Sequence, residues 1–446
     1  MKLVILLTIL LLATSAVAVL LRSVQDATRA PATRMAAVLQ PFVDRRALAG
    51  AVTLVADKDT VLSLEAVGFA DLAANTAMRT DALFWIASLS KPMTAAALMM
   101  LVDEGQVKLD DPVETYLPEF KDQRLAVARE KAPMALKRPQ RPVTVRHLLS
   151  HTSGMPFKSA QEEPTLDRLP LRDAVRSYAS TPLQFEPGSH YQYSNAGFNT
   201  AGRIIEVVSG IPYAEFMAKR LFTPLGMTDT TFWPNDEQLA RLAKSYQPNA
   251  DQTDLEETTI TQLTYPLNAP HRQPMPAGGL FSTAEDVGRF CRMMLNDGVF
   301  DGKRYLSPAA VAQMTRKQTG DLATTGYGLG WAIEGGTVSH AGAYATHMTI
   351  DAKRGLIMVF LVQHAGFLGN GGDSHAAFKQ AAEQRFGGRS GVAAPPRRPE
   401  RHPCGCARAA APRGHAGAPR RGPGCRPQRV GRHESLRRMC PMRSQA

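Results

Sequence analysis

Apolar residues follow a different pattern at the two ends of the chain than in its middle. Residues 51–55 and 61–67 are extended apolar runs separated by a short polar turn, which predicts a β-hairpin. Near the other end, residues 328–333, 340–350 and 356–363 predict three more strands. Strands are therefore expected from both ends of the chain.

Helical spacing of apolar residues dominates between these strands. It predicts a helix at residues 31–46 and a closing helix at 376–385. The predicted helices of the middle region span residues 90–104, 143–151, 171–179, 196–208, 213–221, 284–296 and 308–316. The fold class that this order favours is α/β (α+β): an antiparallel sheet of N- and C-terminal strands, flanked by helices, with an inserted and mostly helical region.

The N-terminus is almost entirely apolar. After Lys2, residues 3–21 contain three hydroxyl side chains and no charge. Residues 16–18, Ala-Val-Ala, have the small-x-small pattern of a signal-peptide cleavage site. We expect residues 1–21 to be a signal peptide, residues 22–32 to be a linker, and the protein to be secreted or periplasmic. The alternative is an uncleaved run that anchors the protein in the inner membrane.

Charge is distributed unevenly along the chain. The formal net charge is +12, and residues 389–446 alone hold 14 arginines and two glutamates. The remaining chain is neutral overall and has no basic stripe, which argues against a nucleic-acid partner. Residues 388–446 are rich in Arg, Pro and Gly without apolar periodicity, so we expect a disordered tail. Residues 33–387 are then one domain, in which Cys291 has no disulfide partner.

Ser88 and Lys91 form a Ser-x-x-Lys pair in front of a strongly helical run. Residues three apart on a helix share a face, where a lysine whose pKa is lowered by burial can accept the proton of a serine hydroxyl. The helix N-terminus also offers N–H groups that stabilise an oxyanion. The same residues are compatible with a serine N-cap and a solvated lysine, so the pair alone does not establish a nucleophile.

Tyr193-Ser194-Asn195 precedes the predicted helix at residues 196–208. A tyrosine can relay a proton when a nearby ammonium stabilises its phenolate, and an asparagine can both donate to and accept from a substrate amide or ester. The alternative is that Asn195 caps the helix and Tyr193 packs in the core.

His340-Ala341-Gly342-Ala343 lies on the predicted strand 340–350. Small side chains at three of these four positions let a substrate or another backbone approach the strand closely. The alternative is an ordinary strand with a hydrogen-bonded histidine.

Taken together and in this order, the three motifs resemble those of the serine β-lactamase and penicillin-binding-protein superfamily. The resemblance is closest to the class C β-lactamase-related group of esterases and D-alanyl peptidases. Further similar segments are residues 84–88, 109–113, 147–154, 187–188, 224–227 and 278–280. The resemblance covers about residues 35–386 and implies a serine hydrolase without a metal or organic cofactor.

The resemblance implies a role for each motif residue. Ser88 would be the acylated nucleophile, Lys91 its general base, and Tyr193 the group that passes the proton to the leaving group. Asn195 would orient the substrate, and the N–H groups of Ser88 and Ala343 would form the oxyanion hole. How Lys91 and Tyr193 divide the proton transfers is left open.

His340 and Gly342 are expected to contact the substrate, at a place where β-lactamases of this superfamily carry Lys-Thr-Gly. A lysine there holds a substrate carboxylate as a fixed cation, whereas a histidine is largely neutral at pH 7. This departure favours an esterase. A D-Ala peptidase or weak β-lactamase is the second enzyme hypothesis, and a catalytically silent cell-wall-binding or sensor protein is a hypothesis of another class.

We expect the partner to be a small-molecule ester or amide or a cell-wall peptide, and the protein to be a monomer. The walls of the substrate pocket are expected from residues 121–141 and 157–169. His147 and His151 are four apart but have no third ligand beside them. The cysteines and histidine of the tail match no usual zinc spacing: His402, Cys404, Cys406, Cys425 and Cys440.

Overall fold

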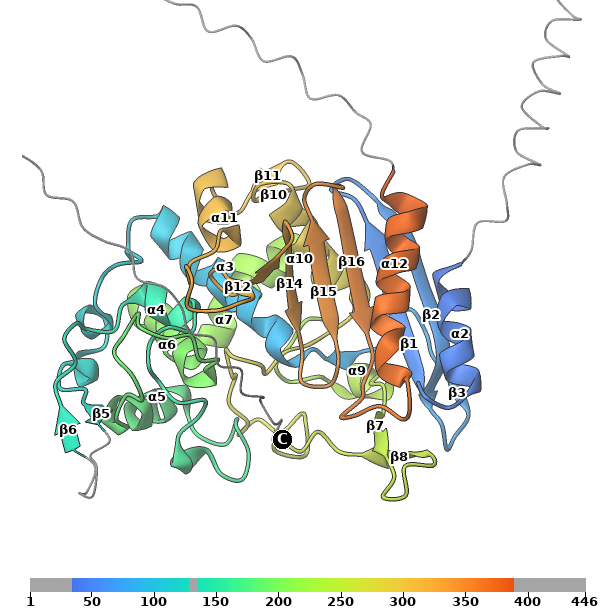
Figure 1. Cartoon of the computed structure of the whole chain (residues 1–446), viewed down its shortest axis with the longest axis horizontal. Helices are drawn as coiled ribbons and strands as arrows, with labels where there is room; N and C mark the ends of the chain where they lie inside the picture. Colours follow the sequence, from blue (N-terminus) through green and yellow to red (C-terminus); the bar gives the residue numbers. More distant parts are fainter. Residues whose placement is uncertain (1–33, 128–134, 389–446) are drawn as a thin grey trace, which may run out of the picture. The chain divides into compact units, whose positions relative to one another are not determined.

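Eight strands form one antiparallel sheet in which the two ends of the domain meet (Figure 1). The computed structural model describes residues 34–127 and 135–388. The strand order is β12-β13-β14-β15-β16-β1-β2-β3. The N-terminal strand β1 (Gly50–Ala56) therefore lies between β2 (Val61–Asp71) and the C-terminal strand β16 (Leu356–Leu361). This confirms the predicted sheet of N- and C-terminal strands.

The remaining elements complete the sheet and cover it. The other strands of the main sheet are β3 (Thr76–Ala77), β12 (Gly326–Tyr327), β13 (Ala332–Glu334), β14 (Thr337–Ala341) and β15 (His347–Asp351). Four short pairs are β4 (Phe84–Trp85) with β9 (Phe281–Ser282), β5 (Leu125–Val127) with β6 (Ala135–Lys137), β7 (Ser245–Pro248) with β8 (Leu255–Thr258), and β10 (Val299–Phe300) with β11 (Lys303–Arg304). The α-helices are α2 (Met35–Asp44), α3 (Ser90–Asp103), α4 (Val145–Leu149), α5 (Leu171–Ser180), α6 (Asn195–Ser209), α7 (Tyr213–Met217), α8 (Thr223–Leu225), α9 (Asp236–Ala240), α10 (Ala284–Leu295), α11 (Pro308–Thr315) and α12 (Ser374–Phe386).

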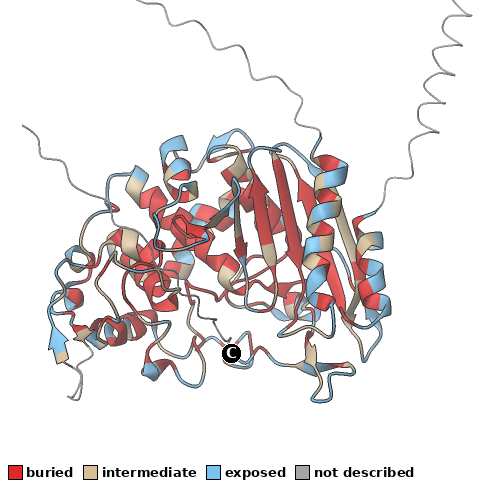
Figure 2. Ribbon diagram, viewed as in Figure 1, coloured by how far each residue is buried: buried red, intermediate tan, exposed pale blue. Residues whose placement is uncertain are grey.

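Helices cover both faces of the sheet, so its central strands are buried along their whole length (Figure 2). Side chains alternate between the faces of a strand. Ala51 and Val55 of β1 accordingly pack with α2 and α12, whereas Val52 and Leu54 pack into the core that contains α3 and α10. Continuous apolar runs are expected for strands that are covered on both sides.

Helix α3 is enclosed on all sides, because residues Ser90 to Leu101 are all buried. It therefore lacks the amphipathic pattern of a surface helix. The inserted helical region, with α4, α5 and α6, lies beside it (Figure 1). The N-terminus of α3, where Ser88 and Lys91 occur, consequently lies between the sheet and this region.

Two segments that were each predicted as one continuous strand are interrupted in the structure. Residues 340–350 form a hairpin, in which β14 ends at Ala341 and β15 begins at His347. The N–H of Gly342 donates to the Thr346 carbonyl at 2.7 Å across the turn. Apart from Gly342 this turn lacks the usual turn residues, which is why an uninterrupted strand was predicted. Residues 328–333 are likewise divided between the end of a turn and β13.

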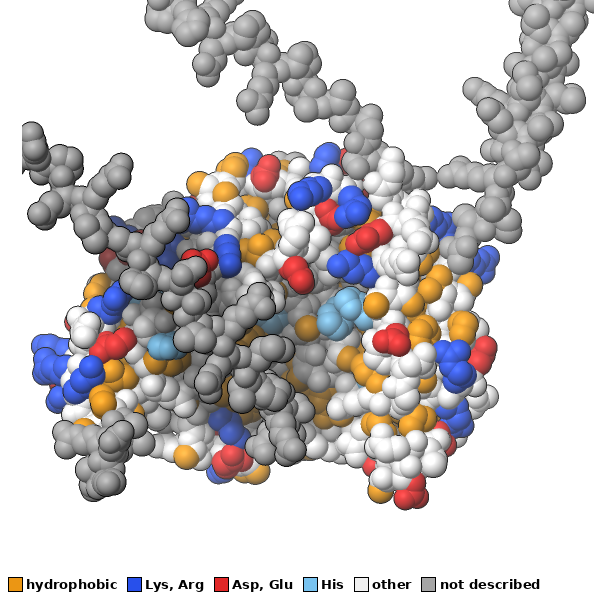
Figure 3. Space-filling view, viewed as in Figure 1, with side chains coloured by type: hydrophobic (Ala, Val, Ile, Leu, Met, Phe, Trp, Pro, Cys, Tyr) orange, Lys and Arg blue, Asp and Glu red, His pale blue; other side chains and the backbone are white. Residues whose placement is uncertain are grey.

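Some predictions fall on residues whose structure is not described. These are the leader 1–21, the linker 22–32 and all but the first residue of the tail 388–446. In residues 34–127 and 135–388, no helix is both long and apolar enough to cross a membrane. On the face shown in Figure 3, basic and acidic side chains of this part are interspersed.

Candidate active site

Ser88 lies in a short 3-10 turn, Ala87–Leu89, between β4 and α3. Ala87 and Leu89 are buried, whereas Ser88 is partly exposed. Ala87 has a φ of 46°, a left-handed conformation that costs a residue with a Cβ about 1–3 kcal/mol. Neighbouring groups hold this turn, because Ser90 Oγ donates to the Ala87 carbonyl at 2.6 Å and the Ile86 N–H donates to the Leu280 carbonyl at 3.0 Å.

Lys91 is fully buried, and its Nζ has three polar neighbours. The nitrogen lies 2.6 Å from the Ala277 carbonyl oxygen, 2.8 Å from Asn195 Oδ1 and 3.0 Å from Ser88 Oγ. Burial lowers the pKa of Lys91 well below its ordinary value of 10.5, because a charged amine loses its hydration. Burial therefore shifts Lys91 toward its uncharged form, compared with a lysine in water.

The three contacts of the amine determine where its lone pair lies. An uncharged amine has two N–H groups and one lone pair. The oxygens of Ala277 and Asn195 are carbonyl oxygens that can only accept, so they take the two N–H groups. In this uncharged state the Ser88 hydroxyl is the donor in the third contact, with its proton directed at the nitrogen.

Tyr193 lies on the other side of the lysine. Lys91 Nζ is 4.6 Å from the centre of the Tyr193 ring. Burial raises the pKa of Tyr193 above its usual value, although a hydrogen bond with Ser88 acts in the opposite direction. The phenol therefore stays protonated in the resting site, next to the buried Lys91 amine.

Asn195 is the first residue of α6, and its neighbour Ser194 is the helix cap. Ser194 Oγ accepts from the Gly197 N–H at 3.1 Å, so the Asn195 side chain is not needed as a cap. It is used for Lys91 instead. The expectation that Asn195 orients a substrate stays a prediction, since its Nδ2 is not engaged by any residue in the described ranges.

His340 is buried in a fixed, uncharged state. Its Nδ1 lies 2.8 Å from the Ala341 carbonyl oxygen and its Nε2 lies 2.9 Å from the Tyr327 hydroxyl. Because a carbonyl can only accept, Nδ1 carries the proton and Nε2 accepts from Tyr327. Burial lowers the pKa of His340 to about 3, although its hydrogen bond with the Ala341 carbonyl acts in the opposite direction. The ring is therefore neutral at physiological pH.

Gly342 and Ala343 form the start of the turn between β14 and β15, against the segment that precedes Ser88. A Cβ at position 342 would lie 2.7 Å from the Ile86 carbonyl oxygen and 2.1 Å from Thr346 Oγ1, so only glycine fits there. Thr346 Oγ1 also donates to the Ile86 carbonyl at 3.2 Å. Ala343 is exposed, and its N–H has no acceptor among the residues that the structure describes.

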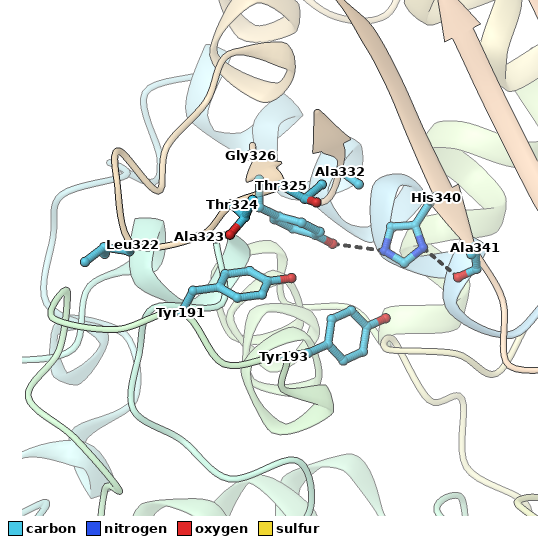
Figure 4. Close-up of a pocket in the computed structure, with 11 residues that line it drawn as sticks. Tyr191, Tyr193, Leu322, Ala323, Thr324, Thr325, Gly326, Ala332, His340 and Ala341 are labelled. Carbon is cyan, nitrogen blue, oxygen red and sulfur yellow. Dashed lines mark hydrogen bonds between the residues drawn. The ribbon is translucent and has the colours of Figure 1, made fainter. Parts of the chain in front are cut away.

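A cavity of about 550 Å³ opens beside these groups (Figure 4). Tyr193 and His340 point into it, together with Tyr191. The complete lining is Tyr191, Tyr193, Leu322, Ala323, Thr324, Thr325, Gly326, Tyr327, Ala332, His340 and Ala341. None of these side chains is an Asp, Glu, Lys or Arg.

A family model described as Beta-lactamase matches residues 35–382. The chain belongs to the beta-lactamase family. Three curated relatives illustrate its range. An uncharacterized protein of Mycobacterium tuberculosis is 32% identical over 367 residues, 74% of this chain and 89% of the relative. Esterase EstB of Burkholderia gladioli is 30% identical over 396 residues, 79% of this chain and 95% of the relative. Penicillin-binding protein 4 of Amycolatopsis lactamdurans is 31% identical over 332 residues, 72% of this chain and 80% of the relative.

A solved structure with the same fold is EstCE1, a hydrolase with promiscuous acyltransferase activity. It is similar with a TM-score of 0.65 at 25% identity and covers 78% of this chain and 97% of its own. The resemblance that the sequence suggested, to class C-like serine hydrolases, is therefore confirmed at the level of the family.

The structure brings the three motifs of this beta-lactamase-family chain into one site. Ser88 and Lys91 come from the start of α3, Tyr193 and Asn195 from the start of α6, and His340 from β14. Their assigned roles stay predictions, but their proximity is a property of the fold.

Sequence analysis missed three residues that shape this family site. Ala277 accepts from Lys91, Tyr327 donates its hydroxyl proton to His340 Nε2, and Tyr191 lines the cavity. Only Tyr191 had a local signal, because it lies two residues before Tyr193 in the same extended segment. Ala277 acts through its main chain, which no residue type reveals.

Of the described residues in the two expected pocket walls, 121–127, 135–141 and 157–169, none lines the cavity. Residues 322–326 line the cavity, whereas Lys121 and Arg138 line a separate cavity of about 250 Å³. Phe157 stacks on Tyr193 at 6.4 Å between ring centres. The loop 322–326 has neither apolar periodicity nor a motif, so the sequence did not distinguish it.

His147 and His151 have structural contacts. The Thr144 N–H donates to His147 Nδ1 at 3.2 Å within a helix cap, and the Ser194 N–H donates to His151 Nδ1 at 3.1 Å. The His151 ring also lies 4.3 Å from the Tyr193 ring. In the described ranges, no three His, Cys, Asp or Glu residues are grouped to hold a metal ion. The tail cysteines and His402 lie outside these ranges.

Proposed function

We propose that this protein is a serine esterase that hydrolyses an uncharged carboxylic ester through an acyl-enzyme on Ser88. The observation that carries the proposal is the set of contacts of Lys91. Two carbonyl oxygens occupy its N–H groups and leave its lone pair for the Ser88 hydroxyl. A buried, uncharged lysine in this arrangement is a general base next to a serine nucleophile.

The reaction follows from this arrangement. Ser88 Oγ attacks the ester carbonyl carbon while its proton moves to Lys91 Nζ. The oxyanion is held by the N–H groups of Ser88 and Ala343. The bond to the alcohol breaks, and the alcohol oxygen takes a proton delivered through Tyr193. Water then attacks the acyl group, releasing the carboxylic acid and restoring the Ser88 hydroxyl.

The cavity supports an uncharged substrate. It is lined by tyrosines and small neutral residues, and His340 carries no charge at neutral pH. A substrate carboxylate would lose its hydration there without gaining a fixed cation, which is unfavourable. Two of the reported relatives, EstB and EstCE1, are an esterase and a hydrolase.

A D-Ala peptidase or weak β-lactamase is the second candidate, supported by the likeness to penicillin-binding protein 4. Both substrates of that class carry a carboxylate next to the scissile bond, and the cavity offers it no Lys or Arg. A silent binding or sensor protein is disfavoured, because the Ser88–Lys91–Tyr193 arrangement is intact.

One labelling experiment separates these candidates. The protein is incubated with a fluorophosphonate probe and, separately, with a fluorescent penicillin, as wild type and as Ser88→Ala. Ser63→Ala is the matched control, since the Ser63 hydroxyl donates to Glu65 Oε1 on the sheet, at 2.6 Å. We expect rapid fluorophosphonate labelling that Ser88→Ala abolishes and Ser63→Ala preserves, with little penicillin labelling.

Other outcomes have defined meanings. Persistent penicillin labelling on Ser88 would transfer the assignment to the peptidase class. Absence of labelling by either probe would reject the enzyme hypothesis. Hydrolysis of 4-nitrophenyl butyrate faster than that of the 4-nitrophenyl monoester of succinate would confirm the preference for an uncharged acyl group.

We also propose that the protein acts outside the cytoplasm, on the basis of the apolar run of residues 3–21. Cell fractionation tests the location, and the N-terminal peptide of the mature protein separates the two forms. A new N-terminus near residue 19 means a cleaved signal, an intact Met1 in the membrane fraction means an anchor, and recovery in the cytoplasm rejects the proposal.

A further inference from the structure

The main-chain segment that holds Lys91 has no regular secondary structure. Ala277, which accepts from Lys91 Nζ at 2.6 Å, lies in a turn at residues 276–278. No helix or sheet ladder fixes the peptide groups of this turn. Its own main-chain bonds run from the Gly278 and Gly279 N–H groups to the Met275 carbonyl, at 3.1 and 2.8 Å, and side chains from other elements hold the rest.

Two buried side chains hold both ends of one peptide group in that turn. Thr94 Oγ1 donates to the Pro276 carbonyl at 2.8 Å, and the Ala277 N–H donates to Asn199 Oδ1 at 3.1 Å. Thr94 and Asn199 are 0% and 2% exposed. This peptide group cannot rotate without breaking one of the bonds. The next peptide group carries the Ala277 carbonyl; its N–H, that of Gly278, donates to the Met275 carbonyl at 3.1 Å, so the Ala277 carbonyl is oriented by this bond together with the two bonds of the preceding peptide.

Helix α6 presents three residues to this region at helical spacing. Asn195 Oδ1 accepts from Lys91 directly at 2.8 Å, and Asn199, one turn later, accepts from Ala277. Gly202, on the same face, leaves room for Pro276, because a Cβ there would lie 2.2 Å from Pro276 Cγ. One face of α6 thus places both carbonyl acceptors of Lys91.

A chain of buried hydrogen bonds continues from Asn199 away from the site. Asn199 Nδ2 donates to the Tyr178 hydroxyl at 2.9 Å, and that hydroxyl donates to Glu162 Oε1. Glu162 Oε2 accepts from the Ser159 N–H at 2.7 Å. Each direction is determined, because the Ala277 N–H can only donate and so makes Asn199 Oδ1 an acceptor. Glu162 and Tyr178 are 1% and 0% exposed.

Filling a core with such a chain of polar groups costs more free energy than filling it with apolar side chains. A buried carboxyl and two polar side chains lose hydration that apolar residues of the same size would not lose, and the chain is favourable only when every member is bonded. Beyond packing, the chain fixes the orientation of the groups that it bonds. Its far end is the Ala277 peptide, next to the base of the proposed reaction.

We propose that Asn199 is a positioning residue for Lys91. Through the Ala277 N–H, and held in turn by Tyr178 and Glu162, it orients the Ala277 carbonyl so that the lone pair of Lys91 faces Ser88. The inference rests on the proposed function, in which Lys91 is the base. It adds a role for three residues that touch neither Ser88 nor Lys91.

The test measures ester hydrolysis by full-length Asn199→Leu, Asn199→Asp and Tyr178→Phe, with 4-nitrophenyl butyrate as substrate and active sites counted by fluorophosphonate labelling. Asn199→Leu removes the acceptor, and kcat per labelled site is expected to fall about 10- to 100-fold with KM nearly unchanged, because a slightly misplaced base loses rate rather than binding. Tyr178→Phe leaves the Ala277 bond in place and should have a smaller effect.

Asn199→Asp is the rescue variant, because it keeps an oxygen that accepts from the Ala277 N–H. It is expected to recover most of the loss at alkaline pH. Its added charge raises the pKa of Lys91, so the acid limb of its kcat/KM profile moves to higher pH. The other titratable neighbours of Lys91 are Tyr193, His151 and His340, and burial keeps all three uncharged.

Thr200→Val is the matched control on the same helix. Thr200 is equally buried, but its hydroxyl donates only to the Ala196 carbonyl of its own helix at 2.8 Å. Its kcat should equal that of the wild type. A folded Asn199→Leu protein with wild-type kcat would overturn the inference, as would equal losses in the Leu and Asp variants. If Asn199→Leu does not fold, a wild-type kcat in Tyr178→Phe together with an unshifted pH profile in Asn199→Asp overturns it.

Failure of the proposed function is distinguishable from failure of this inference. In the first case the wild type is neither labelled at Ser88 nor active on the ester. In the second the wild type is labelled and active, and the Asn199 variants behave like Thr200→Val.

Discussion

The two faces of the central sheet are both buried, but by different chemistry. The face under α2 and α12 packs apolar side chains such as Phe360 and Phe378. The core on the other side contains α3, in which Lys91 and Thr94 are 0% exposed. Apolar packing is non-directional, whereas a buried polar group needs a partner at hydrogen-bond distance. Both sides therefore contribute apolar packing, and the α3 side in addition holds polar groups in fixed orientations.

The largest effect on activity is expected from replacing Lys91, the buried polar residue at the centre of the α3 side. Lys91→Met keeps an unbranched chain of similar length and removes the base. We expect kcat/KM for the ester to fall by about 10²- to 10⁴-fold, the usual contribution of a general base. Thermal unfolding should show that the protein stays folded, because a buried amine loses its hydration and contributes little to stability. An active Lys91→Met would contradict the assignment of the base.

Unfolding at different pH values gives a second test on the same variant. The pKa of Lys91 is lowered in the folded state, so between that pKa and 10.5 the unfolded chain binds one more proton than the folded protein. Wild-type stability should therefore rise with pH across this window. The rise should be smaller in Lys91→Met.

The apolar side should respond in the opposite way. Phe378 of α12 is fully buried, and its ring lies 5.8 Å from that of Phe360. Phe378→Ala is expected to lower the free energy of unfolding by about 3–5 kcal/mol through the lost contacts and the cavity. At a temperature where the variant is folded, kcat per labelled site should be that of the wild type. Phe378→Leu is the smaller change. In denaturant unfolding, its free energy of unfolding should lie between those of the wild type and Phe378→Ala.

His364 tests whether a buried titratable side chain makes the folded protein less stable in acid. Its Nε2 accepts from the Ala49 N–H at 3.1 Å, and burial lowers its pKa from 6.5 to about 4. The unfolded chain therefore binds an extra proton between these values, so the stability is complete above pH 6.5 and is lost as the pH falls toward 4. The loss at pH 4 is of order 3 kcal/mol or less.

His364→Gln can make similar hydrogen bonds without titrating. Its unfolding midpoint should depend less on pH than that of the wild type between pH 6.5 and 4, while both should be similar at pH 7.5. Identical slopes in the two proteins would show that His364 is not a source of acid lability.

The smallest expected effect is a substitution that lowers both the stability and the rate. Gly202→Ala forces Pro276 away from α6, which should cost about 1–3 kcal/mol of stability as overpacking does. Because Pro276 precedes the Lys91 acceptor, kcat should also fall, by several-fold. Gly210→Ala is a control, since no atom lies within 4 Å of a Cβ there. It should lower stability through its positive φ but leave kcat per labelled site unchanged.

Much of the fold could be predicted from local sequence. The runs at 51–55, 61–67 and 356–363 became β1, β2 and β16, because strands covered on both faces or extended by β-branched residues have a visible pattern. The turn at 342–346 was missed because Gly342 is its one usual turn residue. The bonds that close the turn join main-chain groups, the Gly342 N–H with the Thr346 carbonyl and the Ala345 N–H with the Gly342 carbonyl.

The candidate site divides along the same line. Sequence alone determined which residues could carry chemistry: Ser88 and Lys91 by their spacing, and Tyr193, Asn195 and His340 by motif order. Only the tertiary structure decided that Ala277 and Asn195 occupy the N–H groups of Lys91 and that Asn199 holds Ala277. The physical reason is that a local pattern records residue type and period, whereas the direction of a lone pair is set by oxygens from parts of the chain up to 186 residues away.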